Sequence, residues 1–132
     1  MTARGTVETD SSMHTITGVA ENVPDAVFTR FTEFTEPDDA LRDLAVEFGG
    51  GDKLTVMHDM MAAVADRVSY MVGTTGSVTT AGEALKLGQG VCQDHAHIFI
   101  AAARVLGYPA RYVSGYLMMN DRVHQDASHA WA

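Results

Sequence analysis

The sequence has a single cysteine, Cys92, among its 132 residues. One cysteine excludes an internal disulfide, so no covalent link stabilises the fold and the thiol is free for packing or for chemistry. Positive charge is also scarce, because nine Lys and Arg stand against 17 Asp and Glu and give a net charge of −8. A negative chain is repelled by phosphate backbones and by anionic lipid headgroups. Composition therefore argues against a nucleic-acid or membrane partner.

Long hydrophobic runs are absent as well. No stretch reaches the ~20 apolar residues of a membrane span, and the first residues lack the apolar run of a secretion signal. Three prolines and a hydrophobic content of 46% are nevertheless typical of a folded protein. We expect one domain over residues 1–132, with no cofactor, in the reducing environment of the cytoplasm.

Two segments before the cysteine have the apolar spacing of amphipathic helices. The first begins near Pro37 and ends at the glycine run 49–51. The second begins after Asp52, which can cap it, and continues to about Val72. Four methionines of this part are predicted to pack in the core: Met57, Met60, Met61 and Met71.

A short helix and a longer one follow. Thr80 and Glu83 have the spacing of a capping box, which predicts a short helix to about Leu87. After a glycine-rich break, a second helix is predicted from Cys92 to Leu106. Its predicted buried stripe consists of Ala96, Phe99, Ile100, Ala103 and Leu106.

The last part of the chain has the alternation of β-strands. Residues 112–119 predict one strand, and residues 129–132 begin a second, antiparallel strand. The order predicts an α+β fold, with N-terminal helices followed by an incomplete antiparallel β-sheet. Within it, residues 1–35 are a peripheral extension, 36–107 the helical part and 108–132 the start of a β-meander.

Cys92 is a candidate nucleophile because the positive end of a helix favours the reactive thiolate form. The alternative is a structural cysteine, since free cysteines are among the most buried residues. A nucleophilic thiol also needs a base, and the candidates are His95, His97, His124 and His129. His95 shares a helical face with Cys92, whereas His97 points elsewhere, and both are interpreted as packed or solvent-edge histidines.

Three ordered motifs surround these residues: GVCQDHAH at 90–97, ARVLGYPARYVSGY at 103–116 and SHAWA at 128–132. In this order and spacing they resemble the transglutaminase-like superfamily, in its bacterial cysteine-protease-like branch. The resemblance is strong over residues 80–132 and fades over residues 24–79. It implies a papain-like core in which Cys92 attacks an amide carbonyl and His129 is the general base.

The resemblance also implies an acid that orients the imidazole, a dozen or more residues after the His-Ala-Trp motif. That position lies beyond Ala132, so we expect a truncated core domain without its orienting acid. Asp94 and Asp126 are possible substitutes within the chain. They are interpreted instead as a complement to the helix dipole and as a solvated loop charge.

The implied parent enzyme hydrolyses peptide or other amide bonds of a protein or peptide substrate through a cysteine thioester. Acyl transfer from protein glutamine to an amine is the alternative, since it passes through the same thioester. The candidates for oxyanion or substrate contacts are Gln89, Trp131 and Tyr116.

Two readings without catalysis remain open. Cys92, several histidines and Asp94 are of types that zinc accepts, although their spacing matches a structural zinc site poorly and we expect no metal. A degenerate domain kept for protein interaction is the other reading, but that role needs neither Cys92 nor His129. An unfinished sheet also predicts a homodimer through its exposed edge.

Overall fold

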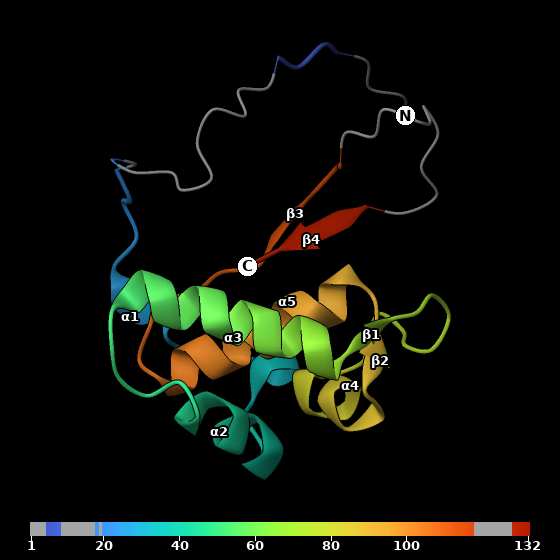
Figure 1. Ribbon diagram of the computed structural model, residues 1–132. Helices are drawn as coiled ribbons and strands as arrows, with labels where there is room; N and C mark the ends of the chain where they lie inside the picture. The colour runs from blue at the N-terminus through green and yellow to red at the C-terminus, as the bar shows by residue number, and fades with distance from the viewer. Residues whose placement is uncertain (1–4, 9–17, 19, 118–127) are drawn as a thin grey trace.

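The structure is a computed structural model that describes residues 5–8, 18, 20–117 and 128–132. Helices precede a small β-sheet, which confirms the predicted α+β class and order (Figure 1). Among the described helices, none has the length and the apolar character that a membrane span needs. In chain order the elements are α1 (Asp25–Phe28), the 3-10 helix η1 (Glu33–Thr35), α2 (Asp39–Val46), α3 (Lys53–Arg67), β1 (Ser69–Tyr70), α4 (Ala81–Leu87), β2 (Gln89–Gly90), α5 (Cys92–Val105), β3 (Val113–Gly115) and β4 (His129–Trp131).

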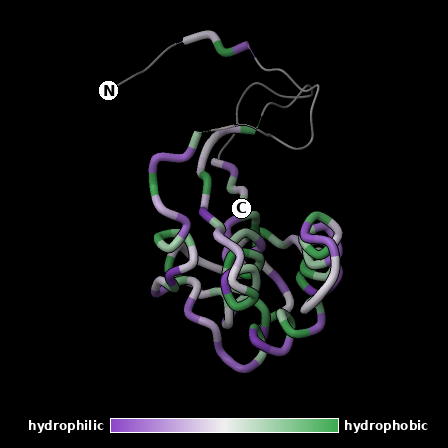
Figure 2. Tube along the Cα trace, turned by 90° about the vertical axis from the view of Figure 1, so that its left-hand side faces the viewer, coloured by the Kyte–Doolittle hydropathy of each residue, from purple (hydrophilic) through white to green (hydrophobic). Residues whose placement is uncertain are grey.

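Helix α5 is the centre of the fold, since it contacts α2, α3, α4 and β4 (Figure 1). Its buried surface differs from the predicted stripe, because Phe99 and Leu106 are only partly buried while neighbours cover the helix on further sides. Small alanines let those neighbours approach closely, and hydrophobic positions run along the packed helices in Figure 2. The fully buried positions of α5 include Ile98, Ile100, Ala101, Ala102 and Ala103.

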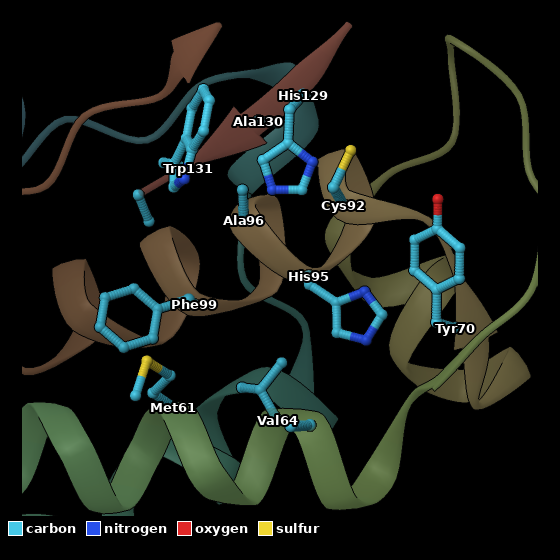
Figure 3. Close-up of a pocket in the computed structure, with 12 residues that line it drawn as sticks. Met61, Val64, Tyr70, Cys92, His95, Ala96, Phe99, His129, Ala130 and Trp131 are labelled. Carbon is cyan, nitrogen blue, oxygen red and sulfur yellow. The ribbon is translucent and has the colours of Figure 1, made fainter. Parts of the chain in front are cut away.

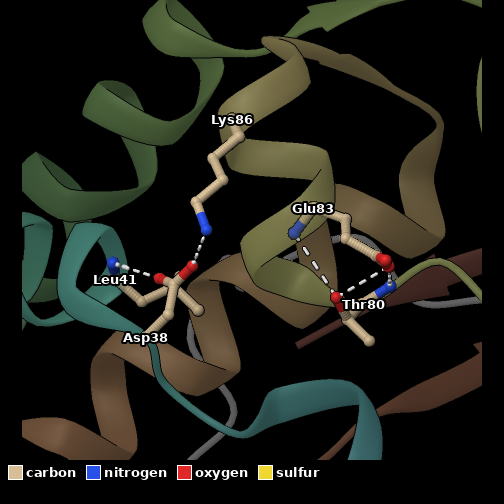
Figure 4. A network of polar contacts seen from close by, with 5 residues as sticks. All are labelled: Asp38, Leu41, Thr80, Glu83 and Lys86. Atoms are coloured by element: carbon tan, nitrogen blue, oxygen red, sulfur yellow. Dashed lines mark hydrogen bonds and ion pairs between the residues drawn. The ribbon is translucent and has the colours of Figure 1, made fainter.

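Asp38 caps α2 and connects it to α4. One carboxylate oxygen accepts a 3.0 Å hydrogen bond from the Leu41 amide, and the other lies 2.7 Å from Lys86 Nζ (Figure 4). The predicted capping box of α4 is confirmed, because Thr80 and Glu83 bond each other's backbone amides. Two helix starts are therefore set by local hydrogen bonds.

Helix α3 begins after Asp52, which accepts a 3.1 Å hydrogen bond from the Thr55 amide as predicted. The helix ends at Arg67 and not at Val72, because the chain turns into β1. The methionine prediction was partly wrong. Met60 is fully buried, whereas Met61 and Met71 are 58% and 43% exposed; the buried face of α3 consists of Val56, Met60 and Val64.

Two short pairs of strands lie beside the helices. The predicted antiparallel pair is confirmed, with Ser114 of β3 opposite Ala130 of β4. Strand β3 is shorter than the predicted strand, and residues 118–119 lie outside the described part. The sequence did not predict the parallel pair of β1 and β2, in which Ser69 lies opposite Gln89.

Arg104 connects the segment before α2 to the end of α5. Its Nε donates to the Phe28 carbonyl at 2.8 Å, its Nη1 to Thr35 Oγ1 at 2.9 Å and its Nη2 to the Ala110 carbonyl at 2.8 Å. Arg111 pairs with Glu21 nearby. The guanidinium of Arg104 is thus almost surrounded by oxygen acceptors.

Candidate active site

Cys92 is the first residue of α5, as the sequence predicts. The start of this helix is organised by Asp94, whose Oδ2 accepts hydrogen bonds from the Val91 amide at 2.7 Å and the Thr75 hydroxyl at 2.6 Å. Asp94 is 1% exposed. A Cβ at position 90 would lie 2.7 Å from Asp94 Oδ2, so only Gly90 leaves room for this buried carboxylate.

The structure brings Cys92 and His129 together. Strand β4 packs on α5, and the thiol of Cys92 lies 3.9 Å from the carbonyl oxygen of Ser128, the residue before His129. Figure 3 shows the His129 imidazole beside the thiol. Both side chains line one cavity of about 390 Å³.

Trp131 covers the imidazole of His129 from one side. Their rings meet edge to face, with centroids 4.6 Å apart and planes at 73°. Ala130, between them in sequence, is buried and lines the same cavity. Strand β4 therefore supplies both the imidazole and a large aromatic wall next to it (Figure 3).

The rest of the cavity wall is mainly apolar. Met61 projects from α3 and lines this cavity, which is why its side chain is exposed. An apolar wall holds little water, which strengthens electrostatic interactions at the thiol. The wall also includes Val64, Ala65, Tyr70, Ala96 and Phe99.

His95 lines the same cavity, but its ring nitrogens face backbone carbonyls. Nε2 lies 2.7 Å from the Val68 oxygen and Nδ1 lies 2.9 Å from the Val91 oxygen. His95 thus joins the end of α3 to the start of α5, and His129 is the histidine beside the thiol.

Comparisons with known proteins show the family of this chain. The sequence model of the transglutaminase-like superfamily matches residues 42–132. The chain belongs to this superfamily. It is also similar to two proteins described as uncharacterized. One, from Mycobacterium leprae, is 30% identical over 145 aligned residues, which cover 99% of this chain and 52% of the relative. The other, from Mycobacterium tuberculosis H37Rv, is 35% identical over 121, covering 83% and 38%.

A solved structure supports the same assignment. The crystal structure of a candidate cysteine protease from Cytophaga hutchinsonii matches with a TM-score of 0.69 and 28% identity. The match covers 80% of this chain and 36% of that protein. The transglutaminase-like chain therefore spans about half or less of the length of these relatives, and its fold is the papain-like core of the superfamily.

Two other residues singled out in the sequence of this transglutaminase-like chain lie outside the cavity that holds the thiol. Gln89 is in β2 and Tyr116 is 88% exposed, and neither lines the cavity. His124 and Asp126 lie outside the described residues. Of the three substrate-contact candidates, Trp131 is thus the one that contacts His129 and lines the cavity with Cys92.

Asp94 serves the helix and not the imidazole. Its Oδ2 is bonded to Val91 and Thr75, while Oδ1 is buried without a hydrogen-bond partner in the described structure. Residues 5–8, 18, 20–117 and 128–132 contain no group of three or more His, Cys, Asp or Glu side chains placed to hold a metal ion.

Sequence reasoning missed Tyr112, which precedes β3. Burial raises the pKa of its phenol, and the nearby charges of Cys92 and Asp94 raise it further. Tyr112 lies in the motif at 103–116 that resembles the superfamily, and this was the one signal in the sequence that could have pointed to it. Nothing in the spacing of the sequence connects Tyr112 with Cys92.

Proposed function

We propose that this chain is the catalytic core of a cysteine enzyme that cleaves peptide or other amide bonds. The observation that supports it best is the meeting of Cys92, at the start of α5, with the His129 imidazole in one cavity. A protein or peptide is the proposed substrate. A free reactive thiol suits a reducing compartment, so the cytoplasm is the proposed location.

The proposed reaction has two stages. His129 takes the thiol proton, and the sulfur of Cys92 adds to the amide carbonyl carbon. The C–N bond then breaks, the amine leaves with the proton from His129, and a thioester remains on Cys92. A water molecule, deprotonated by His129, hydrolyses the thioester to a carboxylic acid and restores the thiol.

The developing negative charge on the carbonyl oxygen needs hydrogen-bond donors. The amide of Cys92 is in the first turn of α5, where N–H groups have no partner within the helix. This amide is the proposed oxyanion donor, and the positive helix end adds to its effect. Trp131 beside His129 is the proposed wall against which the substrate packs.

The test is the rate at which iodoacetamide alkylates Cys92 near neutral pH. Because the thiolate is the reacting form, His129→Ala should slow alkylation by about tenfold. His58→Ala is the matched control, since His58 is an exposed histidine on α3. The same rate in all three proteins would contradict the Cys92–His129 pair.

A further inference from the structure

A second cavity, of about 340 Å³, lies on a neighbouring face of α5. Gln93 and His97 are four residues apart and line it together, whereas Cys92 and Ala96 line the first cavity. The start of α5 therefore separates two cavities. Ser77, Phe34 and Tyr112 are among the other residues that line the second one.

His97 is the unusual group in this cavity. The residue is 8% exposed, and its Nδ1 is buried with no hydrogen-bond partner in the described part of the chain. Its ring stacks on Phe34 with centroids 5.4 Å apart and contacts the Tyr112 ring at 5.1 Å. Buried polar atoms in folded proteins are normally paired, so this imidazole has hydrogen-bonding capacity that the described chain does not use.

Arg104 is the one charged side chain among the described residues that line the cavity, and it would repel a cation. Its guanidinium already donates to Thr35 Oγ1 and to the carbonyls of Phe28 and Ala110, so it is not free to bind an anion. Burial lowers the pKa of His97, which keeps its imidazole neutral near pH 7. An uncharged ligand with hydrogen-bonding groups suits this setting.

The second cavity lies next to the thiol across the start of α5, because Cys92 lines the first cavity and the following residue, Gln93, lines the second. The Tyr112 ring, which contacts His97, forms part of the wall of the second cavity. We propose that the second cavity is a substrate subsite that binds an uncharged polar side chain, of the carboxamide class, next to the amide attacked at Cys92. This assignment rests on the proposed function, and it adds a side-chain preference to it.

The test uses Cys92→Ala, which cannot form a thioester, and three blocked amino acids of nearly equal size. These are the N-acetyl, N-methylamide derivatives of asparagine, aspartate and leucine. Binding is followed by NMR through the imidazole resonances. The asparagine compound should shift the His97 signals and bind about tenfold more tightly than the charged or the apolar compound, since a lost hydrogen bond costs about that factor.

Variants of the cavity wall locate the binding. His97→Phe should weaken the asparagine compound by about tenfold, whereas His58→Phe, the same change at an exposed position, should not. Gln93→Ala, at a half-buried lining position, provides a second variant if His97→Phe does not fold. Equal binding of the three compounds, or unchanged His97 signals, would overturn the proposal.

The two proposals fail in different ways. Alkylation that depends on His129, together with no binding at His97, would leave the catalytic pair intact and overturn the subsite. Binding at His97 without any effect of His129 on alkylation would leave a binding cavity and overturn its assignment as a substrate subsite.

Discussion

The hydroxyl of Thr75 donates a 2.6 Å hydrogen bond to the buried carboxylate of Asp94. Because the same carboxylate oxygen accepts the Val91 amide, the contact connects the loop after β1 to the start of α5. Cys92 is the next residue after Val91. A contact that is distant in sequence thus supports the position of the thiol.

Thr75→Val should lower the free energy of unfolding by about 2 kcal/mol, because a hydrogen bond to a buried charged group is lost. Thr74→Val is the matched control. The Thr74 hydroxyl donates to the Met71 carbonyl at an exposed site, so its loss should cost about 0.5 kcal/mol or less. Urea unfolding measures both, and equal losses would contradict a special role for Thr75.

His95→Phe should lower the free energy of unfolding by about 2 kcal/mol, since the carbonyls of Val68 and Val91 lose their partner. It should also slow alkylation of Cys92, because the start of α5 is less firmly held. Thermal unfolding and the iodoacetamide rate measure the two effects, with His58→Phe as control. A slower alkylation without loss of stability would instead mean that His95 acts directly on the thiol.

Because His97 is buried, we expect the protein to lose stability in mild acid. Burial lowers its pKa from the usual 6.5. Above that value the imidazole is neutral in both states, but as the pH falls below it the unfolded chain takes up the proton first, and stability is lost until the folded-state pKa is reached.

His97→Phe should therefore lose less unfolding free energy than the unaltered chain between about pH 7.5 and 5.5. Urea unfolding at both pH values gives the two differences. Asp38, Asp52 and Glu83 also have lowered pKa values, but they change stability only below this pH range, because their ordinary pKa values are 3.8, 3.8 and 4.5. The same loss in both proteins would rule out a buried neutral imidazole.

Gly82→Ala should destabilise the protein, although alanine is favoured over glycine in helices by about 1 kcal/mol. The new Cβ would lie 2.6 Å from Asp38 Oδ2, so the carboxylate that caps α2 must move (Figure 4). Lys86→Met removes only the exposed partner of Asp38 and should cost less than about 1 kcal/mol. A more stable Gly82→Ala protein would show that Asp38 moves freely.

Part of the site follows from sequence alone because its causes are local. The caps Asp52 and Thr80 each bond an amide three residues later, so short-range spacing was enough to predict them. Asp38 caps α2 in the same way, although the sequence predicted that this helix begins near Pro37. Cys92 at the start of a buried helix follows in the same way.

The predictions from sequence were wrong where contacts between distant segments decide the end of a helix or the burial of a side chain. Helix α3 ends before Val72 because Ser69 pairs with Gln89, a partner that its own periodicity does not contain. Met61 has helical core spacing, yet it lines the cavity that α3 shares with α5 and β4.

The sequence by itself determined the order of the main helices and of the antiparallel strands that follow them, the caps Asp52 and Thr80, and the place of Cys92, since hydrogen bonds and side-chain periodicity act within a few residues. Only the tertiary structure decided that Thr75 meets Asp94 and that His97 lies between Phe34 and Tyr112. These contacts depend on how α5 is enclosed by its neighbours, and packing between distant segments is not encoded in local spacing.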